Sequence, residues 1–237
     1  AQTRLHLAQK AFEHTAAYDA AISNWLTEDN EELPNSLQIE FKKAQTLRYG
    51  ENPHQTGSRY RNTQKSSWWD NAVMHGGKEM SYLNVYDTDA AWRLVHSLSE
   101  EPTAAIIKHA NPCGAAISTD IASAYQLAYD CDSISAFGGI TAVNREVTKD
   151  MAERLTEVFA EVLIAPGFTA EALEILCMKK NLRILEAEKP ERPAFEMRSI
   201  GNSLLVQTSD VAQTKRDEWE VVTTRVPTEN EWKDLEF

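Results

Sequence analysis

The sequence is poor in cysteine and in cationic residues. Its three cysteines are scattered, and no two of them have the spacing of metal ligands or of a disulfide framework. Lys and Arg number 24 against 36 Asp and Glu, which gives a formal net charge of −12 and argues against a broad nucleic-acid surface. We therefore expect a protein of a reducing compartment, the cytoplasm, that does not bind nucleic acid.

Long apolar runs are also missing. No stretch is long enough to span a membrane, and no basic and apolar leader opens the chain, so we expect no membrane association. Because the chain begins with Ala1 rather than Met, we expect it to be a piece of a longer protein. Its 42% hydrophobic content over 237 residues suffices for one large core or two modest ones.

The middle of the chain alternates between strand and helix patterns. Short apolar runs predict strands at 104–107, 140–143, 162–165 and 182–185. Capping residues followed by helical spacing predict helices that begin after Asp120, Thr148 and Thr169, and another that begins at Asp87 or Thr88. This alternation predicts an α/β domain in which helices flank a layered, mostly parallel sheet.

The N-terminal part has a different pattern. Residues 1–27 carry apolar side chains at helical spacing and predict a helix, followed by an acidic stretch that ends at Pro34. The helix is either the tail of a preceding domain or the first helix of this one, and the residues alone do not separate the two. Residues 37–47 alternate like a half-buried strand, whereas 57–80 suggest an irregular excursion.

The C-terminal part predicts a β ribbon. Residues 195–208 and 218–226 alternate like two strands of an antiparallel ribbon, with a charged segment between them. A short helix is expected to begin at Thr228.

The most reactive combination of side chains is Lys108 beside His109, between an apolar run and an Asn-Pro turn. An amine and an imidazole can share acid and base work near neutral pH if their surroundings lower the lysine pKa. The plain alternative is a basic pair that caps a strand. Pro112-Cys113 is similar to part of a zinc deaminase motif, but Ala116 occupies the second cysteine position and no His-x-Glu precedes it, so we expect no metal.

Three motifs, taken in this order, carry a resemblance to a known family: Leu47-Arg48-Tyr49-Gly50-Glu51-Asn52-Pro53-His54-Gln55, Lys108-His109-Ala110-Asn111-Pro112-Cys113-Gly114 and Ser133-Ile134-Ser135-Ala136-Phe137-Gly138-Gly139. They resemble the transformylase part of the bifunctional AICAR transformylase/IMP cyclohydrolase family of purine biosynthesis, over essentially the whole chain. AICAR is 5-aminoimidazole-4-carboxamide ribonucleotide. The resemblance implies a cytidine deaminase-like fold without zinc. It also implies formyl transfer to AICAR from 10-formyltetrahydrofolate, which would be a co-substrate.

The resemblance also implies roles for individual residues. His109 would be the base, and Lys108 would stabilise charge and protonate the leaving folate nitrogen. Neighbours on an extended strand point to opposite faces, so both reach one substrate only if the chain turns there. The implied substrate-binding residues are Arg48, Tyr49, Asn84, Phe137, Gly138 and Glu161.

The residues alone leave some of these roles open. Arg48 has the planar fork that suits a phosphate, and Tyr49 can stack on a heterocycle, but an arginine at a strand end is more often a surface ion pair. Asn84 can pair with a carboxamide, or it can be an ordinary cap or turn residue. Glu161, a glutamate before a strand, would usually be solvated.

The resemblance divides the chain into three parts. Residues 1–34 would end a preceding cyclohydrolase domain, 35–200 would form the first of two transformylase lobes, and 201–237 would be the ribbon and link toward the second lobe. Related enzymes imply a homodimer with shared sites, so we expect this piece to be weakly active or inactive alone. The competing hypothesis is a non-catalytic nucleotide-binding or oligomerisation module.

Overall fold

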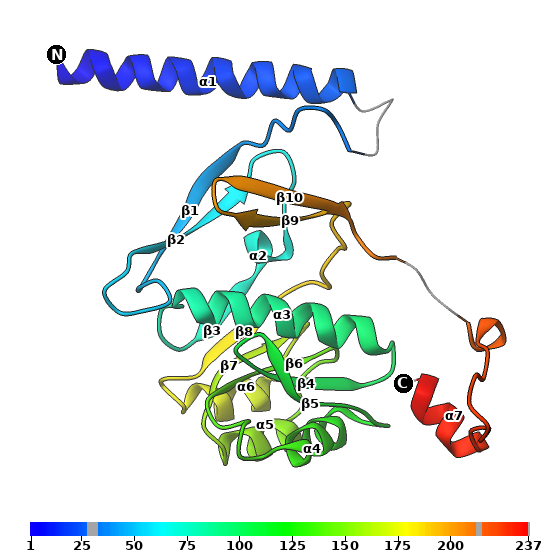
Figure 1. Ribbon diagram of the computed structural model, residues 1–237. Helices are drawn as coiled ribbons and strands as arrows, with labels where there is room; N and C mark the ends of the chain where they lie inside the picture. Colours follow the sequence, from blue (N-terminus) through cyan, green and yellow to red (C-terminus); the bar gives the residue numbers. More distant parts are fainter. Residues whose placement is uncertain (28–32, 212–214, 237) are drawn as a thin grey trace. The chain divides into compact units, whose positions relative to one another are not determined.

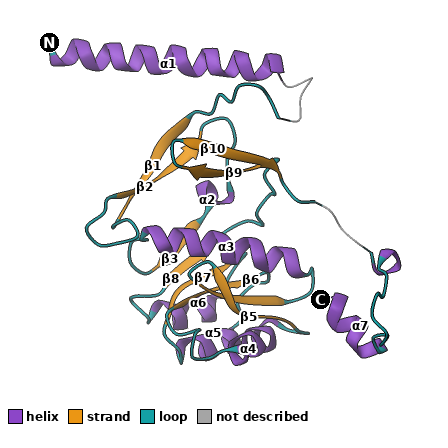
Figure 2. Ribbon diagram, viewed as in Figure 1, coloured by secondary structure: helices purple, strands orange, loops and turns teal. Residues whose placement is uncertain are grey.

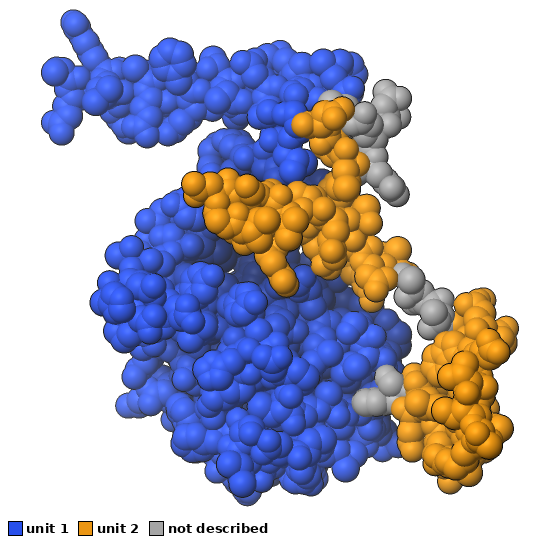
Figure 3. All heavy atoms as spheres, in the orientation of Figure 1, with its two compact units in different colours: residues 1–29, 36–191 blue, residues 30–35, 192–237 orange. Residues whose placement is uncertain are grey.

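The computed structural model describes residues 1–27, 33–211 and 215–236, so most of the acidic stretch predicted as a linker lies outside the described residues. The chain forms two compact units (Figure 3). The first unit comprises residues 1–29 and 36–191, and the second comprises 30–35 and 192–237.

The first unit is built on a six-stranded sheet with the order β3-β8-β7-β6-β4-β5 (Figure 1). Its strands are β3 (Val73–Gly76), β4 (Thr103–Lys108), β5 (Asn111–Ile117), β6 (Gly139–Val143), β7 (Ala160–Ala165) and β8 (Arg183–Glu186). The strands β6, β7 and β8 run parallel, whereas β4 is antiparallel to β6, and the outer strands β5 and β3 are antiparallel to their neighbours. The four strands predicted from apolar runs are confirmed as β4, β6, β7 and β8.

Helices cover both faces of this sheet (Figure 2). One face packs against α3 (Tyr82–Leu98), and the other packs against α4 (Ile121–Cys131), α5 (Lys149–Thr156) and α6 (Ala170–Cys177). Adjacent strand residues alternate between the layers: Ile106 and Leu163 belong to the cluster of α4, α5 and α6, whereas Ile107 and Ile164 belong to the cluster of α3. Because both faces of the inner strands are buried, β4, β6, β7 and β8 each contain an apolar run, as is usual in layered α/β folds.

The predicted caps of three helices are confirmed. The side chains of Asp120, Thr148 and Thr169 accept hydrogen bonds from backbone N–H groups in the first turns of α4, α5 and α6. The predicted start of α3 was wrong, because the helix begins at Tyr82 rather than near Asp87. Ser81 caps it in a capping box with Asn84, so Asp87 lies inside the helix.

Residues 57–80, predicted to be irregular, contain regular elements. The strands β1 (Phe41–Leu47) and β2 (Gly57–Asn62) form an antiparallel pair, and α2 (Trp68–Asn71) precedes β3. The strand predicted over 37–47 therefore begins later, at Phe41. The N-terminal helix is confirmed as α1 (Gln2–Thr27), which is continuous.

The second unit contains the predicted ribbon with a different pairing. Its hairpin lies entirely within 195–208, where β9 (Phe195–Ile200) pairs with β10 (Ser203–Thr208). The turn uses Gly201 at a φ of 55°, a conformation that glycine adopts without a steric penalty. The strand predicted over 218–226 was wrong: a short 3₁₀ helix spans Arg216–Glu218, and 219–226 form no strand. The final helix is confirmed as α7 (Glu229–Glu236).

Candidate active site

The residues predicted to form a site gather at one edge of the sheet, where β4 ends and the parallel strands begin. Because β4 is antiparallel to β6, with Ile107 opposite Ile140, the end of β4 at Lys108 lies next to the start of β6. Glu161 is the second residue of β7, and Arg183 is the first residue of β8. The fold thus brings to one edge of the sheet the strand residues Lys108, Glu161 and Arg183, the first and last of which are 75 positions apart in the sequence.

The amine of Lys108 is held against the loop before β6. Its Nζ donates a hydrogen bond to the carbonyl oxygen of Phe137 at 2.5 Å. Gly138 adopts a φ of 70°, and a Cβ at this position would lie 3.3 Å from the lysine Nζ. The backbone N–H of Gly138 donates to the carbonyl oxygen of Phe159 at 2.7 Å, and the rings of Phe137 and Phe159 contact each other. Three of the predicted residues therefore form one local cluster.

His109 lies in the two-residue turn that joins β4 to β5. The turn predicted at Asn111-Pro112 was wrong, because both residues belong to β5 and the chain turns earlier, at His109 and Ala110. Both His109 and Ala110 have positive φ angles, 53° and 57°. This is the left-handed pattern of a type I′ hairpin turn, in which non-glycine residues are strained. Lys108 ends β4, whereas His109 lies in the turn and outside the regular alternation of the strand, so the two side chains need not point to opposite faces of the sheet.

The strained turn is bound by a residue that was not predicted as part of the site. The carboxylate of Asp87 accepts the backbone N–H of His109 at 3.2 Å and that of Ala110 at 3.0 Å. Asp87 is only 8% exposed. The pKa of Asp87 is raised, mainly because the carboxyl group is buried and also because Glu161 is nearby. The two N–H bonds and the charge of His109 act in the opposite direction and reduce this increase.

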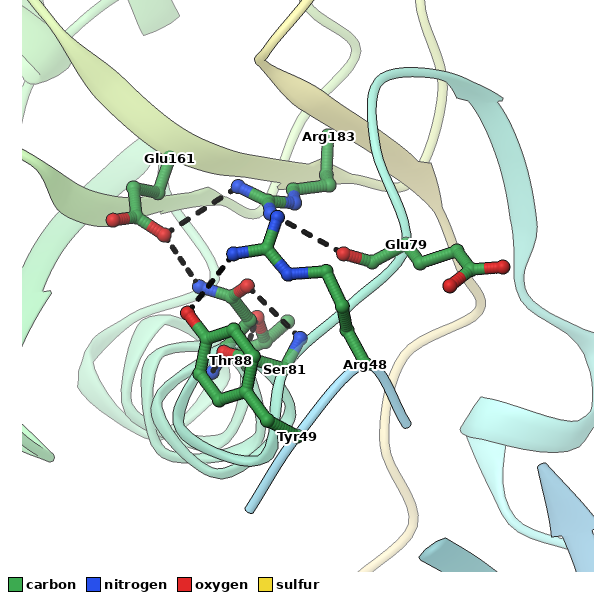
Figure 4. A network of polar contacts seen from close by, with 8 residues as sticks. Arg48, Tyr49, Glu79, Ser81, Thr88, Glu161 and Arg183 are labelled. Atoms are coloured by element: carbon green, nitrogen blue, oxygen red, sulfur yellow. Dashed lines mark hydrogen bonds and ion pairs between the residues drawn. The ribbon is translucent and has the colours of Figure 1, made fainter. Parts of the chain in front are cut away.

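Glu161 is at the centre of a second network (Figure 4). Its Oε2 accepts hydrogen bonds from Asn84 Nδ2 at 2.7 Å and from Arg183 Nη1 at 3.4 Å. Arg183 Nη2 also donates to the carbonyl oxygen of Glu79 at 3.2 Å, and the Arg183 side chain is only 7% exposed. Asn84 is thus both a cap residue, through Oδ1, and a donor to Glu161, while Glu161 is paired rather than merely solvated.

Arg48 and Tyr49 lie beside this network. The guanidinium carbon of Arg48 is 4.7 Å from the centroid of the Tyr49 ring, and its Nη2 donates to the tyrosine hydroxyl at 3.0 Å. Backbone bonds from Arg48 to Met80 and from Tyr82 to Tyr49 join this segment to the start of α3. Arg48 is exposed, and no carboxylate among the described residues forms an ion pair with it. Arg48 therefore does not form the surface ion pair that was the alternative interpretation of its sequence position.

The two arginines share one electrostatic environment. Burial lowers the pKa of Arg183, the positive charge of Arg48 lowers it further, and Glu161 acts in the opposite direction. Arg183 Nε is buried and makes no hydrogen bond within the described part of the chain. A positively charged region with unused donor capacity suits an anionic ligand.

Sequence reasoning missed Asp87 and Arg183 for identifiable reasons. Asn84 and Asp87 are three positions apart and share a helix face, which becomes apparent only when the helix begins at Tyr82, after the Ser81 cap. Arg183 is a charged residue directly before the apolar pair Ile184-Leu185 in a buried strand, which is itself a signal of a functional role. Across residues 1–27, 33–211 and 215–236, no group of three His, Cys, Asp or Glu side chains is placed to hold a metal ion.

An α/β domain that gathers a lysine, a histidine and two arginines at one edge of its sheet has the components of a group-transfer site for an anionic substrate. A family model described as AICARFT/IMPCHase bienzyme matches residues 1–237, and the chain belongs to this family.

Two relatives carry the name bifunctional purine biosynthesis protein PurH. The chain is 46% identical over 249 residues to the one from Neisseria gonorrhoeae (strain NCCP11945). It is 48% identical over 241 residues to the one from Bacillus cereus (strain ZK / E33L). Each match covers 100% of this chain and 47% of the relative, so the chain spans about half the length of these proteins. No helix in the described ranges is long and apolar enough to cross a membrane.

Proposed function

We propose that this chain supplies part of the active site of a phosphoribosylaminoimidazolecarboxamide formyltransferase, which moves a formyl group from 10-formyltetrahydrofolate to AICAR in purine (IMP) biosynthesis. The observation that carries the proposal is the position of Lys108 and His109. In a member of this family, Lys108 ends β4 and His109 follows it in the turn, at the same sheet edge as Glu161 of β7.

The proposed chemistry needs a base and a cationic donor. The 5-amino group of AICAR is a poor nucleophile, because its lone pair is delocalised into the imidazole and its N–H bonds to the carboxamide. His109 takes a proton from this amine as its nitrogen bonds to the formyl carbon. The Lys108 ammonium stabilises the tetrahedral oxyanion and then protonates N10 of the folate as the carbon–N10 bond breaks. The hydrogen bond from Lys108 Nζ to the Phe137 carbonyl supports its role as a donor.

The remaining residues suit the substrate. Arg48 offers an exposed guanidinium to the phosphate, and the Tyr49 ring offers an aromatic face to the imidazole. Asn84 and Glu161 provide amide and carboxylate groups that complement the carboxamide. Phe137 is 60% exposed, and with Gly138 it gives the folate an apolar surface and a close approach to the backbone.

The organisation of the whole protein is part of the proposal. Residues 1–34 end a preceding cyclohydrolase domain and 35–200 form the first transformylase lobe, whereas 201–237, which begin with the second strand of the ribbon, link it toward a second lobe. The functional unit is a homodimer whose sites are shared between subunits. The isolated 237-residue chain is then weakly active or inactive, although it carries both proposed catalytic residues.

Binding of AICAR, measured by calorimetry, tests the site. R48A should weaken binding by about 10-fold or more, the effect of losing a charge-assisted contact to phosphate. R93A is the matched control, because Arg93 is an exposed arginine on α3 that pairs with Asp89. Equal binding by R48A and the unmodified chain would contradict the proposed site. If binding depends on Arg48 but a version extended at both ends transfers no formyl group, the chain is a non-catalytic nucleotide-binding module.

A further inference from the structure

The turn that carries His109 is in a conformation that its own sequence does not favour. Type I′ hairpin turns place two successive residues at positive φ, and they select Asn, Asp or Gly for this reason. Here the two positions hold His109 and Ala110, at 53° and 57°. Something outside the turn must therefore compensate for the strain.

The compensating contacts come from α3. Asp87 Oδ2 accepts the N–H of His109, and Asp87 Oδ1 accepts the N–H of Ala110, so one carboxylate binds both strained residues. The helix around Asp87 is itself well anchored, because its first turn is capped by Ser81 and Trp92 is buried in the core. The backbone N–H groups have little freedom as long as this carboxylate is in place. Asn111 Nδ2 adds a third bond, to the carbonyl oxygen of His109.

We propose that Asp87 is a positioning residue for His109: its carboxylate holds the β4–β5 turn, which carries His109 directly after Lys108, in its left-handed conformation. This inference rests on the proposed function, in which His109 is the base. Asp87 takes no part in the bond changes of the reaction and acts through the backbone of the turn. A carboxylate suits this role because two oxygens can each accept one N–H bond, and the charged acceptor strengthens both bonds.

The variant D87N tests the role with little change in side-chain volume. An asparagine has one oxygen to accept an N–H bond, and its NH₂ group opposes the second N–H. D89N is the matched control: Asp89 is two residues further along α3, and its carboxylate contacts Arg93 and Trp68 rather than the turn. The double variant D87N/A110G tests rescue, because glycine adopts positive φ without the steric penalty.

Two measurements separate positioning from general stability. In the version extended at both ends, D87N should lower kcat by about 10- to 100-fold, while KM for AICAR changes by less than about 3-fold. D89N should remain within about 2-fold of the unmodified protein in both constants. The double variant should recover about 10-fold in kcat relative to D87N, if left-handed strain is the cause. In nitrogen-15 NMR spectra of the 237-residue chain, D87N should shift the amide signals of His109 and Ala110, and D89N should not.

The possible failures are distinguishable. If H109A abolishes activity but D87N keeps kcat within about 2-fold, the positioning role is refuted and the proposed function stands. If H109A keeps full activity, the proposed base is refuted, and the positioning role is refuted with it. Unchanged His109 and Ala110 amide signals in D87N would show that Asp87 does not hold the turn, whatever the activity.

Discussion

Replacing Gly138 by alanine should lower the formyl-transfer activity strongly and the stability of the fold only slightly. Gly138 has a φ of 70°, and the left-handed region costs an alanine about 1–2 kcal/mol. The added Cβ would lie 3.3 Å from Lys108 Nζ and 3.3 Å from the Phe159 ring, so these neighbours must give by a few tenths of an ångström. The amine is the end of a flexible side chain and can move. We therefore expect G138A to lower the free energy of unfolding by only about 1–2 kcal/mol.

Displacement of the amine should have a larger effect on activity. Lys108 Nζ donates a hydrogen bond to the Phe137 carbonyl, so movement of Nζ away from the added Cβ changes the position at which the amine is held. We expect the rate of formyl transfer in the extended protein to fall by about 10-fold or more, because small misplacements of catalytic groups are costly. Urea unfolding followed by tryptophan fluorescence gives the stability, and initial rates give the activity.

The matched control is G167A. Gly167 follows β7 at the opposite end from Glu161, and its Cβ would meet only Glu146, at 3.8 and 3.9 Å. No left-handed φ is required there, so G167A should stay within about 0.5 kcal/mol of the unmodified protein and keep its activity. The same loss of stability in both variants, or full activity of G138A, would refute the reasoning.

Three further predictions concern single residues. G114A places a Cβ 1.9 Å from the carbonyl oxygen of Ala128, a rigid helix backbone, and should lower the free energy of unfolding by about 3 kcal/mol or more; a thermally stable variant would contradict this close approach. Burial lowers the pKa of His96 to about 4, so between pH 6.5 and 4 the unfolded chain binds a proton more readily and stability falls as pH falls. After allowance for solvent screening, the free energy of unfolding should fall by about 1–2 kcal/mol between pH 7.5 and 5, as measured by urea unfolding. The H96L variant should not show this decrease, and an identical pH dependence of both proteins would contradict the low pKa of His96. R183K keeps the positive charge but loses the planar guanidinium group that donates to Glu161 and to the Glu79 carbonyl. Calorimetry should show that this variant binds AICAR about 10-fold more weakly. An unchanged affinity would mean that Arg183 does not align Glu161.

Features with local signals could be predicted from the sequence. The caps at Asp120, Thr148 and Thr169 are recognisable because each side chain bonds an N–H only three residues away. The strands β4, β6, β7 and β8 are recognisable because burial on both faces gives each of them an apolar central run. Lys108 and His109 could also be identified as candidates, because an amine and an imidazole are adjacent in the sequence directly after an apolar run.

Features that depend on tertiary contacts could not be predicted. The strand β5 contains Pro112 and Gly114, which argue against a strand, yet Gly114 is needed because the backbone of α4 approaches it closely. The antiparallel direction of β4 brings the residues of the site to one edge, and no local pattern records that direction. Asp87 and His109 are 22 positions apart, and their contact depends on the β4–β5 hairpin, which the sequence did not predict.

The rate of formyl transfer tests the central claim most directly. AICAR and 10-formyltetrahydrofolate should be supplied to the 237-residue chain, to a version extended at both ends, and to K108A and H109A variants of the extended version. We predict that the extended version is active, that both variants lose activity by at least about 100-fold, and that the 237-residue chain alone is weakly active or inactive. Full activity of the extended protein without Lys108 and His109 would contradict the assigned chemistry. No activity in any version would leave the nucleotide-binding module as the function of this chain.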